Sequence, residues 1–306
     1  MGDARDDGVV TGRRENGPRA LVRVAEPIHG ISYYPREIDY SSYGYRGWWH
    51  AYFGYRSAPM GAVTAGTVVA TFYNFAPRMV AQAVPDVWSI QSPADTVAMR
   101  LERVEQAMGR IFGPESAGGR PNTTEMARAA LLLRRGLDDL SGAGRPLFAA
   151  YAQLDWPDDD LTALWHGSTL LRELRGDGHN VALAAAEVDG VSSHVLMAGR
   201  GFGNKPTILS IRGWTEAEWD DAVRRLGDRG WVDDGGALTE LGRGARSEIE
   251  RHTDALSTGP VAKLGVDGLQ ELLGYLDPLA DYLKATGEVP GRWPPKHLDR
   301  LRADNP

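Results

Sequence analysis

The fold is decided by the segment LWHGSTLLRELRGDGH, residues 164–179. Its leucines have the spacing of a core helix, yet it also carries two histidines, two arginines and two acidic residues. Polar groups that are buried need hydrogen-bond or charge partners. We therefore expect this helix either to hold a structural polar network or to form the wall of a functional site.

On a helical wheel the polar residues around this segment separate into two stripes. One stripe contains Thr162, His166, Thr169 and Glu173, and the other contains Ser168, Arg172 and Arg175. Gly176 is expected to end the helix in the left-handed conformation, with Asp177 capping a following helix at residues 178–186. Helix capping leaves four residues without a structural explanation: His166, Arg172, Arg175 and His179.

Residues of these types can form an acid–base site. An imidazole changes charge near neutral pH and can transfer protons, and a guanidinium can neutralise a carboxylate or an enolate. Asp177 is close enough in the sequence to orient one imidazole. The candidate catalytic residues are His166, Arg172, Asp177 and His179.

Length and composition limit what such a site can do. The 306 residues are enough for two domains, and the net charge of −7 is the wrong sign for a protein that coats nucleic acid. The absence of cysteine excludes disulfides and thiolate chemistry, and the histidine spacing matches no metal signature, so we expect no metal and no other cofactor. No apolar run approaches the roughly 20 residues of a membrane span, and the start carries no secretory signal. We expect a cytoplasmic protein with no membrane partner.

An aromatic-rich region precedes the segment. Ten tyrosine, tryptophan and phenylalanine residues lie between positions 33 and 55. From residue 46 their spacing becomes helical and places Trp49, Tyr52 and Arg56 on one face. Asn74 is expected to cap a helix that begins at Pro77. The candidate ligand-binding residues are Trp48, Trp49, Tyr52, Arg56, Tyr73, Asn74, Arg78 and Arg175, and the alternative for the rings is that they are core.

The chain divides at a stretch rich in glycine and proline, residues 113–121. We expect a disordered tail at 1–20, an aromatic-rich helical domain at 21–113 and a further domain at 122–259. A helix at 266–286 and a loosely ordered tail at 287–306 complete the chain. The leucine stripe of that last helix is expected to pack on the body or on a second subunit, which favours a homodimer.

Several short segments carry a family resemblance: EPIH at 26–29, GYRSAPMG at 54–61, FYNF at 72–75, and much of 164–179. Together they resemble an actinobacterial helix-turn-helix family, over residues 21 to about 259. Residues 213–256 also look like the end of a MarR-type winged helix, with a helix at 214–226, a wing at 233–239 and a closing helix from Leu241. The resemblance implies a fold that is mainly α with a small β-wing: a MarR-like winged-helix body preceded by an aromatic-rich helical N-terminal domain.

The expected recognition helix has the wrong charge for DNA. It carries Glu216, Glu218, Asp220 and Asp221, and the expected wing adds Asp233 and Asp234. These carboxylates would face the phosphates of DNA with the same sign, whereas DNA-reading helices need cationic or amide side chains. The alternative recognition helix, residues 188–198, carries Ser192, Ser193 and His194 but no cation. DNA binding is therefore disfavoured.

Three hypotheses for the function follow. The first is a small-molecule-binding protein on a winged-helix scaffold, with a small aromatic or anionic ligand. It includes a cofactor-independent enzyme of specialised metabolism that performs cyclisation, elimination or hydrolysis. The second is a ligand-responsive, dimeric MarR-like regulator, and the third is that the polar groups form a satisfied core network. If a site exists, we expect it to face from residues 164–179 toward Trp49, Tyr52 and Arg56.

Overall fold

The structure is a computed structural model that describes residues 17–113 and 122–291. Within these ranges the chain is mainly helical and contains no strand. The first half holds α1 Pro18–His29, α2 Trp48–Ser57, α3 Ala65–Phe72, α4 Pro77–Ala81, α5 Val87–Ile90, α6 Pro93–Phe112 and α7 Thr123–Leu137. The second half holds α8 Pro146–Ala152, α9 Asp160–Ala185, α10 Gly190–Ala198, α11 Lys205–Arg212, α12 Glu216–Asp228, α13 Glu240–Ala255 and α14 Gly259–Ala285. Three 3-10 turns lie at Gly30–Ser32 (η1), Ser41–Tyr43 (η2) and Ala58–Met60 (η3).

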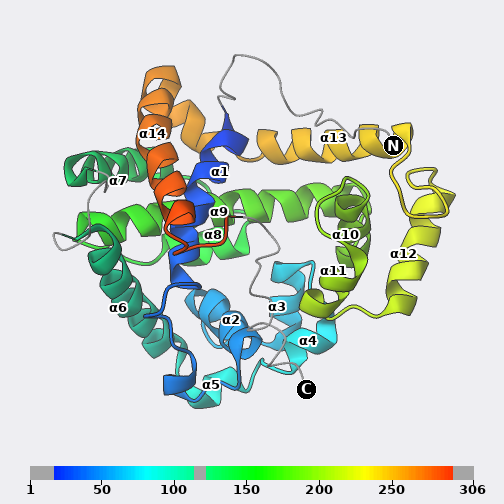
Figure 1. The fold of residues 1–306 in the computed structure, drawn as a ribbon, viewed down its shortest axis with the longest axis horizontal. Helices are drawn as coiled ribbons and strands as arrows, with labels where there is room; N and C mark the ends of the chain where they lie inside the picture. The colour runs from blue at the N-terminus through cyan, green and yellow to red at the C-terminus, as the bar shows by residue number, and fades with distance from the viewer. Residues whose placement is uncertain (1–16, 114–121, 292–306) are drawn as a thin grey trace.

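The central element is α9, which crosses the middle of the molecule (Figure 1). The carboxylate of Asp159 begins the helix by accepting a hydrogen bond from the backbone N–H of Thr162. Every side chain from Thr162 to Leu171 is buried, because α1, α6, α7, α8 and α13 all pack on this helix. A helix covered on so many sides must place its polar groups inside the protein.

The predicted break in this helix at Gly176 and Asp177 is wrong, because α9 continues to Ala185. A glycine inside a helix costs about 1 kcal/mol relative to alanine, which the packing of neighbouring helices offsets. Asp177 does not cap a following helix. Its Oδ2 instead accepts a hydrogen bond of 2.9 Å from the backbone N–H of Phe148, so it caps the start of α8 from across the interface.

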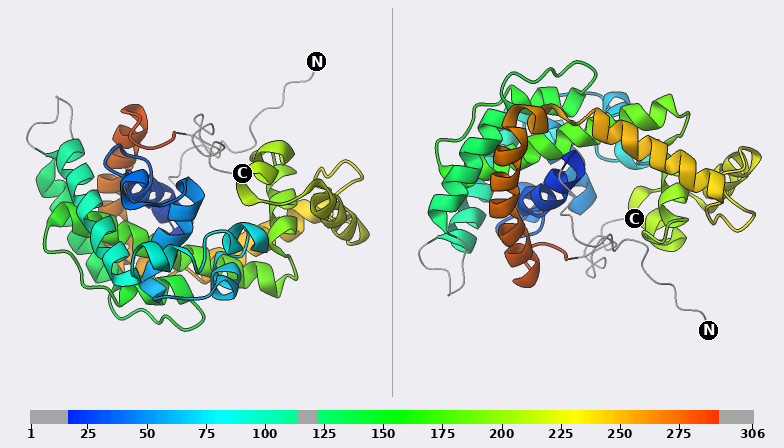
Figure 2. Two further views of the ribbon diagram at one scale, coloured as in Figure 1. Left: turned by 90° about the horizontal axis from the view of Figure 1, so that it is seen from below. Right: turned by 90° about the horizontal axis from the view of Figure 1, so that it is seen from above.

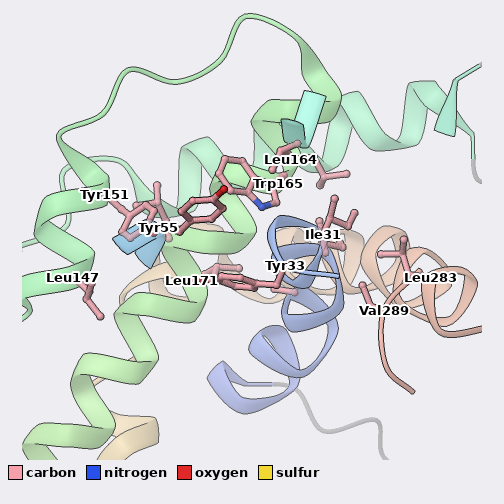
Figure 3. Packing of buried hydrophobic residues seen from close by; sticks show 14 of the residues in the cluster. Ile31, Tyr33, Tyr55, Leu147, Tyr151, Leu164, Trp165, Leu171, Leu283 and Val289 are labelled. Atoms are coloured by element: carbon pink, nitrogen blue, oxygen red, sulfur yellow. The ribbon is translucent and has the colours of Figure 1, made fainter. Parts of the chain in front are cut away.

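The larger hydrophobic core draws on almost the whole length of the chain. It joins α1 and α14 to α6, α7 and α9, so residues of the segments 21–113, 122–259 and 266–286 pack together. Figure 3 shows Tyr33, Tyr55, Tyr151 and Trp165 close to one another, although they come from four separate parts of the sequence. Figure 2 shows α1 beside α14 at one end of the molecule and α12 at the other.

A second, smaller core holds the helix-turn-helix unit, which we define as α10, α11 and α12. The last turns of α9 and the side of α13 close this core. Its buried residues include Ala182, Leu183, Val191, Val195, Ile208, Trp219, Ala222, Leu226, Val232 and Ile249. The unit is therefore built on the end of α9 and shares that helix with the larger core.

The expected β-wing is not formed as a pair of strands. In the described part of the chain it is reduced to one isolated antiparallel bridge between Val232 and Leu238. The side chain of Asp233 accepts hydrogen bonds from the backbone N–H groups of Gly235 and Ala237, which closes a tight turn. Thr239, the residue after Leu238, already caps α13. The segments on either side of the turn are therefore too short to form paired strands.

Three other boundaries differ from the sequence prediction. α1 begins at Pro18, within the stretch 1–20 that was expected to be a tail. α4 is capped by Ala76 without any side-chain hydrogen bond, so Asn74 is not its cap. The last helix begins at Gly259 and is kinked at Gly265. The rest of the expected N-terminal tail, the boundary at 114–121 and residues 292–306 lie outside the described ranges.

None of the helices in the described ranges is both long and apolar enough to cross a membrane alone. α9 and α10 satisfy the length and composition requirements only as a pair that is bent by 99°. In this structure the side chains of residues 162–171 of α9 are buried, because other helices pack on them.

Close packing of α7 on α9 depends on Gly167. A Cβ at this position would lie 2.8 Å from Cβ of Leu133 and 3.2 Å from the ring of Trp156. We expect Gly167→Ala to lower the free energy of unfolding by about 1–3 kcal/mol, because the added methyl overpacks the interface. Chemical denaturation followed by circular dichroism measures this change. The matched control is Gly109→Ala in α6, where an added Cβ has no neighbour within 4 Å, and equal destabilisation by both variants would contradict the packing argument.

Candidate functional site

Two helices meet through a buried ion pair. Arg56 of α2 contacts Glu173 of α9 with both ends of its guanidinium, at 3.0 Å from Nε to Oε1 and 2.8 Å from the terminal nitrogen to Oε2. Arg172 donates to the same Oε2 at 2.8 Å. The carboxylate of Glu173 is completely buried and Arg56 nearly so. The expected approach of α9 to Arg56 is present, and Tyr52 joins it by accepting a hydrogen bond from Arg56.

A third arginine, Arg212, approaches from α11. Its guanidinium carbon lies 4.3 Å from the ring centre of Phe75. Burial lowers the pKa of Arg212 to about 10, with Tyr52 opposing the shift and the positive charges of Arg56 and Arg172 adding to it. We call Arg56, Arg172 and Arg212 the arginine cluster. The cluster joins α2 and α9 to Arg212, the last residue of α11, which is the second helix of the helix-turn-helix unit. The charges of Arg56 and Arg172 act on Arg212.

Two guanidinium groups share one buried carboxylate at this site. Burial alone would raise the pKa of Glu173, but Arg172 and Arg56 together lower it well below its usual value. The next carboxylate, that of Glu26, is about half exposed and lies 3.7 Å from Nε of Arg172. Glu173 is therefore an ionised partner shared by two arginines. A buried excess of guanidinium groups is costly unless an anion compensates it.

Aromatic rings form a continuous wall beside the arginine cluster. Tyr34 stacks on Trp48 with ring centres 6.5 Å apart, and Trp48 stacks on Tyr52 at 5.1 Å. The ring of Phe72 lies 4.4 Å below the guanidinium of Arg56. Tyr34 and Trp48 are only half buried, so the wall runs from the surface to the buried ion pair. Trp49 packs behind this wall, and its buried indole N–H has no hydrogen-bond partner among the described residues.

A neutral histidine lies next to the arginine cluster. Nδ1 of His29 is 3.0 Å from Oγ1 of Thr169, and both side chains are buried. Burial and the nearby charge of Arg172 hold the pKa of His29 well below its ordinary value. The imidazole therefore adds no further positive charge at neutral pH.

Arg100 of α6 is a second buried guanidinium that sequence analysis missed. Its partners are oxygen atoms of Ser32, Tyr33, Tyr55 and Tyr151, and none of them is a carboxylate. The Trp165 ring lies 5.3 Å from its guanidinium carbon. The sequence did contain a signal, because Arg100 lies on the apolar stripe of α6 with Met99, Val104 and Ala107. His29 and Arg212 carried no comparable signal, since their role depends on contacts between distant segments.

The four candidate catalytic residues lie in different places. Arg172 belongs to the arginine cluster, and Asp177 caps α8. His166 packs edge-on against Trp156 with ring centres 5.0 Å apart.

His179 contacts α13. The hydroxyl of Thr253 donates its hydrogen to the carbonyl of Ile249, so Nδ1 of His179 is the donor in its hydrogen bond of 2.9 Å to Thr253. The structure thus brings only Arg172 to the Arg56 side of α9.

The other candidate ligand-binding residues also have structural partners. Arg175 pairs with Glu250 and Asp254 of α13 at 3.1 and 2.9 Å. Arg78 pairs with Glu218 of α12 at the surface. Tyr73 donates a hydrogen bond of 2.6 Å to the carbonyl of Val188, and the carbonyl of Asn74 accepts hydrogen bonds from His194 and Trp214. Tyr73 and Asn74 therefore hold the helix-turn-helix unit in place.

Within residues 17–113 and 122–291, no group of three or more histidine, aspartate or glutamate side chains is placed to hold a metal ion. The side chains of the site described above are positively charged guanidinium groups together with phenol and indole rings.

Three short helices in succession, of which the last precedes a tight turn and a long closing helix, define a helix-turn-helix architecture. A sequence model for a helix-turn-helix family matches residues 18–290, so the chain belongs to this family. No curated protein and no solved structure matches the chain. The family match shows the helix-turn-helix class and does not extend to the MarR-like details.

Removing the shared carboxylate tests the ion-pair network. Glu173→Gln leaves Arg56 and Arg172 without their buried counter-charge, so we expect the free energy of unfolding to fall by about 3–5 kcal/mol. Urea denaturation measures it. In the control, Glu271→Gln removes the partner of Arg128 from an exposed pair, and we expect little change. A Glu173→Gln protein as stable as the parent would contradict the assigned role.

Buried histidines predict a loss of stability in acid. Burial, with the nearby charges of Arg212 and Arg100 respectively, lowers the pKa of His194 to about 3 and that of His166 to about 4. The unfolded chain binds these protons near pH 6.5, so stability is complete above that pH and decreases as the pH falls toward 4. Burial raises the pKa of Asp177 to about 6, which acts in the opposite direction over the same range.

The histidines outnumber Asp177, so we expect a net decrease in the free energy of unfolding between pH 7 and pH 5. His194→Gln should flatten this dependence, because glutamine can donate to the Asn74 carbonyl but does not titrate. Denaturation at a series of pH values measures the slope. An unchanged slope in the variant would show that His194 is not responsible.

Proposed function

We propose that this protein binds a small organic anion at the arginine cluster, and that the bound anion acts on the helix-turn-helix unit. The observation that carries the proposal is that two guanidinium groups, those of Arg56 and Arg172, share one buried carboxylate. Such an excess of buried positive charge is unfavourable in the free protein. A bound anion would remove that cost, which gives the site affinity for negatively charged ligands.

The neighbouring rings indicate what kind of anion fits. Guanidinium groups bind carboxylates with two parallel hydrogen bonds, and the side chain of Arg172 is 23% exposed, which leaves part of it open to such a contact. The half-buried Tyr34 places a flat aromatic ring nearby. A planar aromatic carboxylate matches both features, with its charge at the arginine cluster and its ring against the aromatic wall.

Coupling to the helix-turn-helix unit is supported by the position of α11. Ile208 of this helix lies in the smaller core, whereas Ile211 lies in the larger core and Arg212 enters the arginine cluster. The carbonyl of Arg212 also accepts a hydrogen bond of 2.9 Å from the backbone N–H of Ala76. A ligand that moves Arg212 would therefore displace the C-terminal end of α11.

The junction between the two parts is tightly packed. A Cβ on Gly190, the first residue of α10, would lie 2.4 Å from the carbonyl oxygen of Tyr73. Only glycine permits this approach of the backbone to the start of α10. A displacement of the Tyr73–Asn74 backbone would reach α10 directly, because no loose linker separates them.

The charges of α12 argue against DNA as the target of this unit. Lys205 pairs with Glu216 and Asp220 of α12, and Arg225 pairs with Asp189 of α10. The cations near the helix are already engaged by carboxylates, and α12 itself carries five acidic residues against two arginines. A polyanion would meet electrostatic repulsion here.

A MarR-like, dimeric regulator is the second candidate function. The family match and the order of α10, α11, α12, the tight turn and α13 favour it. It differs from the first proposal in requiring that the helix-turn-helix unit bind DNA. An acid–base enzyme has less support, because His166, Asp177 and His179 point to three different neighbours.

Ligand binding is tested with benzoate, salicylate and indole-3-acetate, and with the corresponding neutral amides. We expect at least one carboxylate to raise the melting temperature and to bind by calorimetry, and its amide not to bind. Arg172→Gln should weaken binding roughly tenfold or more, since it removes a charged hydrogen-bond donor. Arg128→Gln, at an exposed ion pair far from the site in sequence, should bind as the parent does. Equal binding of acids and amides would overturn the proposal.

DNA binding is tested by titrating the protein with duplex DNA from its own upstream region at two salt concentrations. We expect no sequence-selective complex at physiological salt, because α12 and the turn after it are acidic. Tight, selective binding that Arg224→Gln or Arg225→Gln weakens would instead favour the regulator. The same assay with and without salicylate shows whether an anion changes the affinity.

A further inference from the structure

Glu26 of α1 places a negative charge beside the arginine cluster. Its Oε2 lies 3.7 Å from Nε of Arg172, whereas Glu173 accepts its hydrogen bond from a terminal nitrogen of the same guanidinium. The separation of 3.7 Å is longer than a hydrogen bond. The side chain of Glu26 is 55% exposed. A carboxylate has about four lone-pair sites, so Glu26 can accept a hydrogen bond from a further donor.

Tyr34 supplies an aromatic ring at the same place. The backbone N–H of Gly30 donates to the carbonyl of Glu26, so Gly30 lies one helical turn beyond it. Two ring carbons of Tyr34 are 3.6 and 3.7 Å from the point where a Cβ on Gly30 would lie. Burial raises the pKa of Tyr34, and the charge of Glu26 raises it further while that of Arg172 lowers it. A carboxylate, a guanidinium and a half-buried ring therefore lie close together.

We propose that the ligand of this site is an aromatic α-amino acid, with its carboxylate on Arg172, its ammonium group on Glu26 and its ring against Tyr34. An α-amino acid carries both charged groups on one carbon atom. It is therefore complementary to a cation and an anion that lie side by side, as Arg172 and Glu26 do. The inference rests on the proposed function, because it keeps the carboxylate of the ligand at the arginine cluster.

Glu26 distinguishes an amino acid from a simple aromatic acid. A carboxylate bound to Arg172 comes close to Glu26, because Glu26 is itself only 3.7 Å from that guanidinium. Two negative charges at short range repel each other. The ammonium group of an amino acid lies between them and pairs with Glu26, whereas a simple acid leaves the two carboxylates facing each other. Discrimination of this kind depends on repelling the wrong ligand as well as on attracting the right one.

The test uses pairs of ligands that differ only in the amino group: L-tryptophan with indole-3-propionate, and L-phenylalanine with 3-phenylpropionate. Calorimetry at pH 7 measures their affinities for the full chain. We expect the parent protein to bind each amino acid about tenfold more tightly than the corresponding acid, which is the effect of one charge-assisted hydrogen bond. Glu26→Gln should reverse this order, because it removes the partner of the ammonium group and the repulsion of the simple acid.

The matched control is Glu105→Gln, which removes an exposed carboxylate from α6 and changes the net charge by the same amount. This variant should keep the order of affinities of the parent. Arg172→Gln should weaken the binding of both members of each pair. A folding defect in Glu26→Gln would also lower both affinities together, so it cannot produce the reversal.

Equal affinity of the parent for an amino acid and its corresponding acid would overturn this inference and leave the proposed function in place. An unchanged ratio of the two affinities in Glu26→Gln would do the same, because it would show that Glu26 does not contact the amino group. If the parent binds none of these ligands and none of the carboxylates named for the proposed function, both proposals fail.

Discussion

The contact between Arg56 and Glu173 is the interaction on which the rest of this structure depends. It joins the aromatic-rich helix α2 to the central helix α9 by two charged hydrogen bonds inside the protein. Neither charge is stable there alone, since an unpaired buried ion costs several kcal/mol. The two elements must therefore fold against each other, and the aromatic wall is fixed next to α9 as a result. Arg172 directly precedes Glu173 in the sequence, so the position of Glu173 also places Arg172 beside the ion pair.

The arginine cluster also explains why the helix-turn-helix unit is not an appendage. Arg212 ends α11 inside the aromatic region, and its guanidinium responds to the charges of Arg56 and Arg172. The carbonyl of Asn74 accepts hydrogen bonds from His194 of α10 and from Trp214. Polar contacts thus join the two hydrophobic cores at this place, in addition to the continuous helix α9 that both cores share. Any change of charge at that place acts on both cores, which is the physical basis of the proposed response to an anion.

Local sequence patterns predicted the helices well and the site only in part. The side chains of Ser92 and Asp159 cap the starts of α6 and α9, which is what residues of these types favour at a helix N-terminus. The side of α9 that carries Arg172 was expected to face Arg56, but the partner that Arg56 contacts there, Glu173, was not among the expected site residues. Local signals failed at Gly176 and Asp177, because packing on both sides kept α9 continuous. The grouping of Arg212, Arg100 and His29 depends on contacts between segments far apart in the chain, and no spacing within one segment encodes such contacts.

The sharing of α9 between two hydrophobic cores limits how the protein can be divided. Ala182 and Leu183 belong to the smaller core, but they lie on the same continuous helix as Leu164 and Leu171 of the larger one. A fragment that began after α9 would lose part of its own interior, and one that ended before residue 182 would leave a helix end without cover. The helix-turn-helix unit of this chain is therefore not a transplantable module, and recombination between family members would have to exchange α9 together with it.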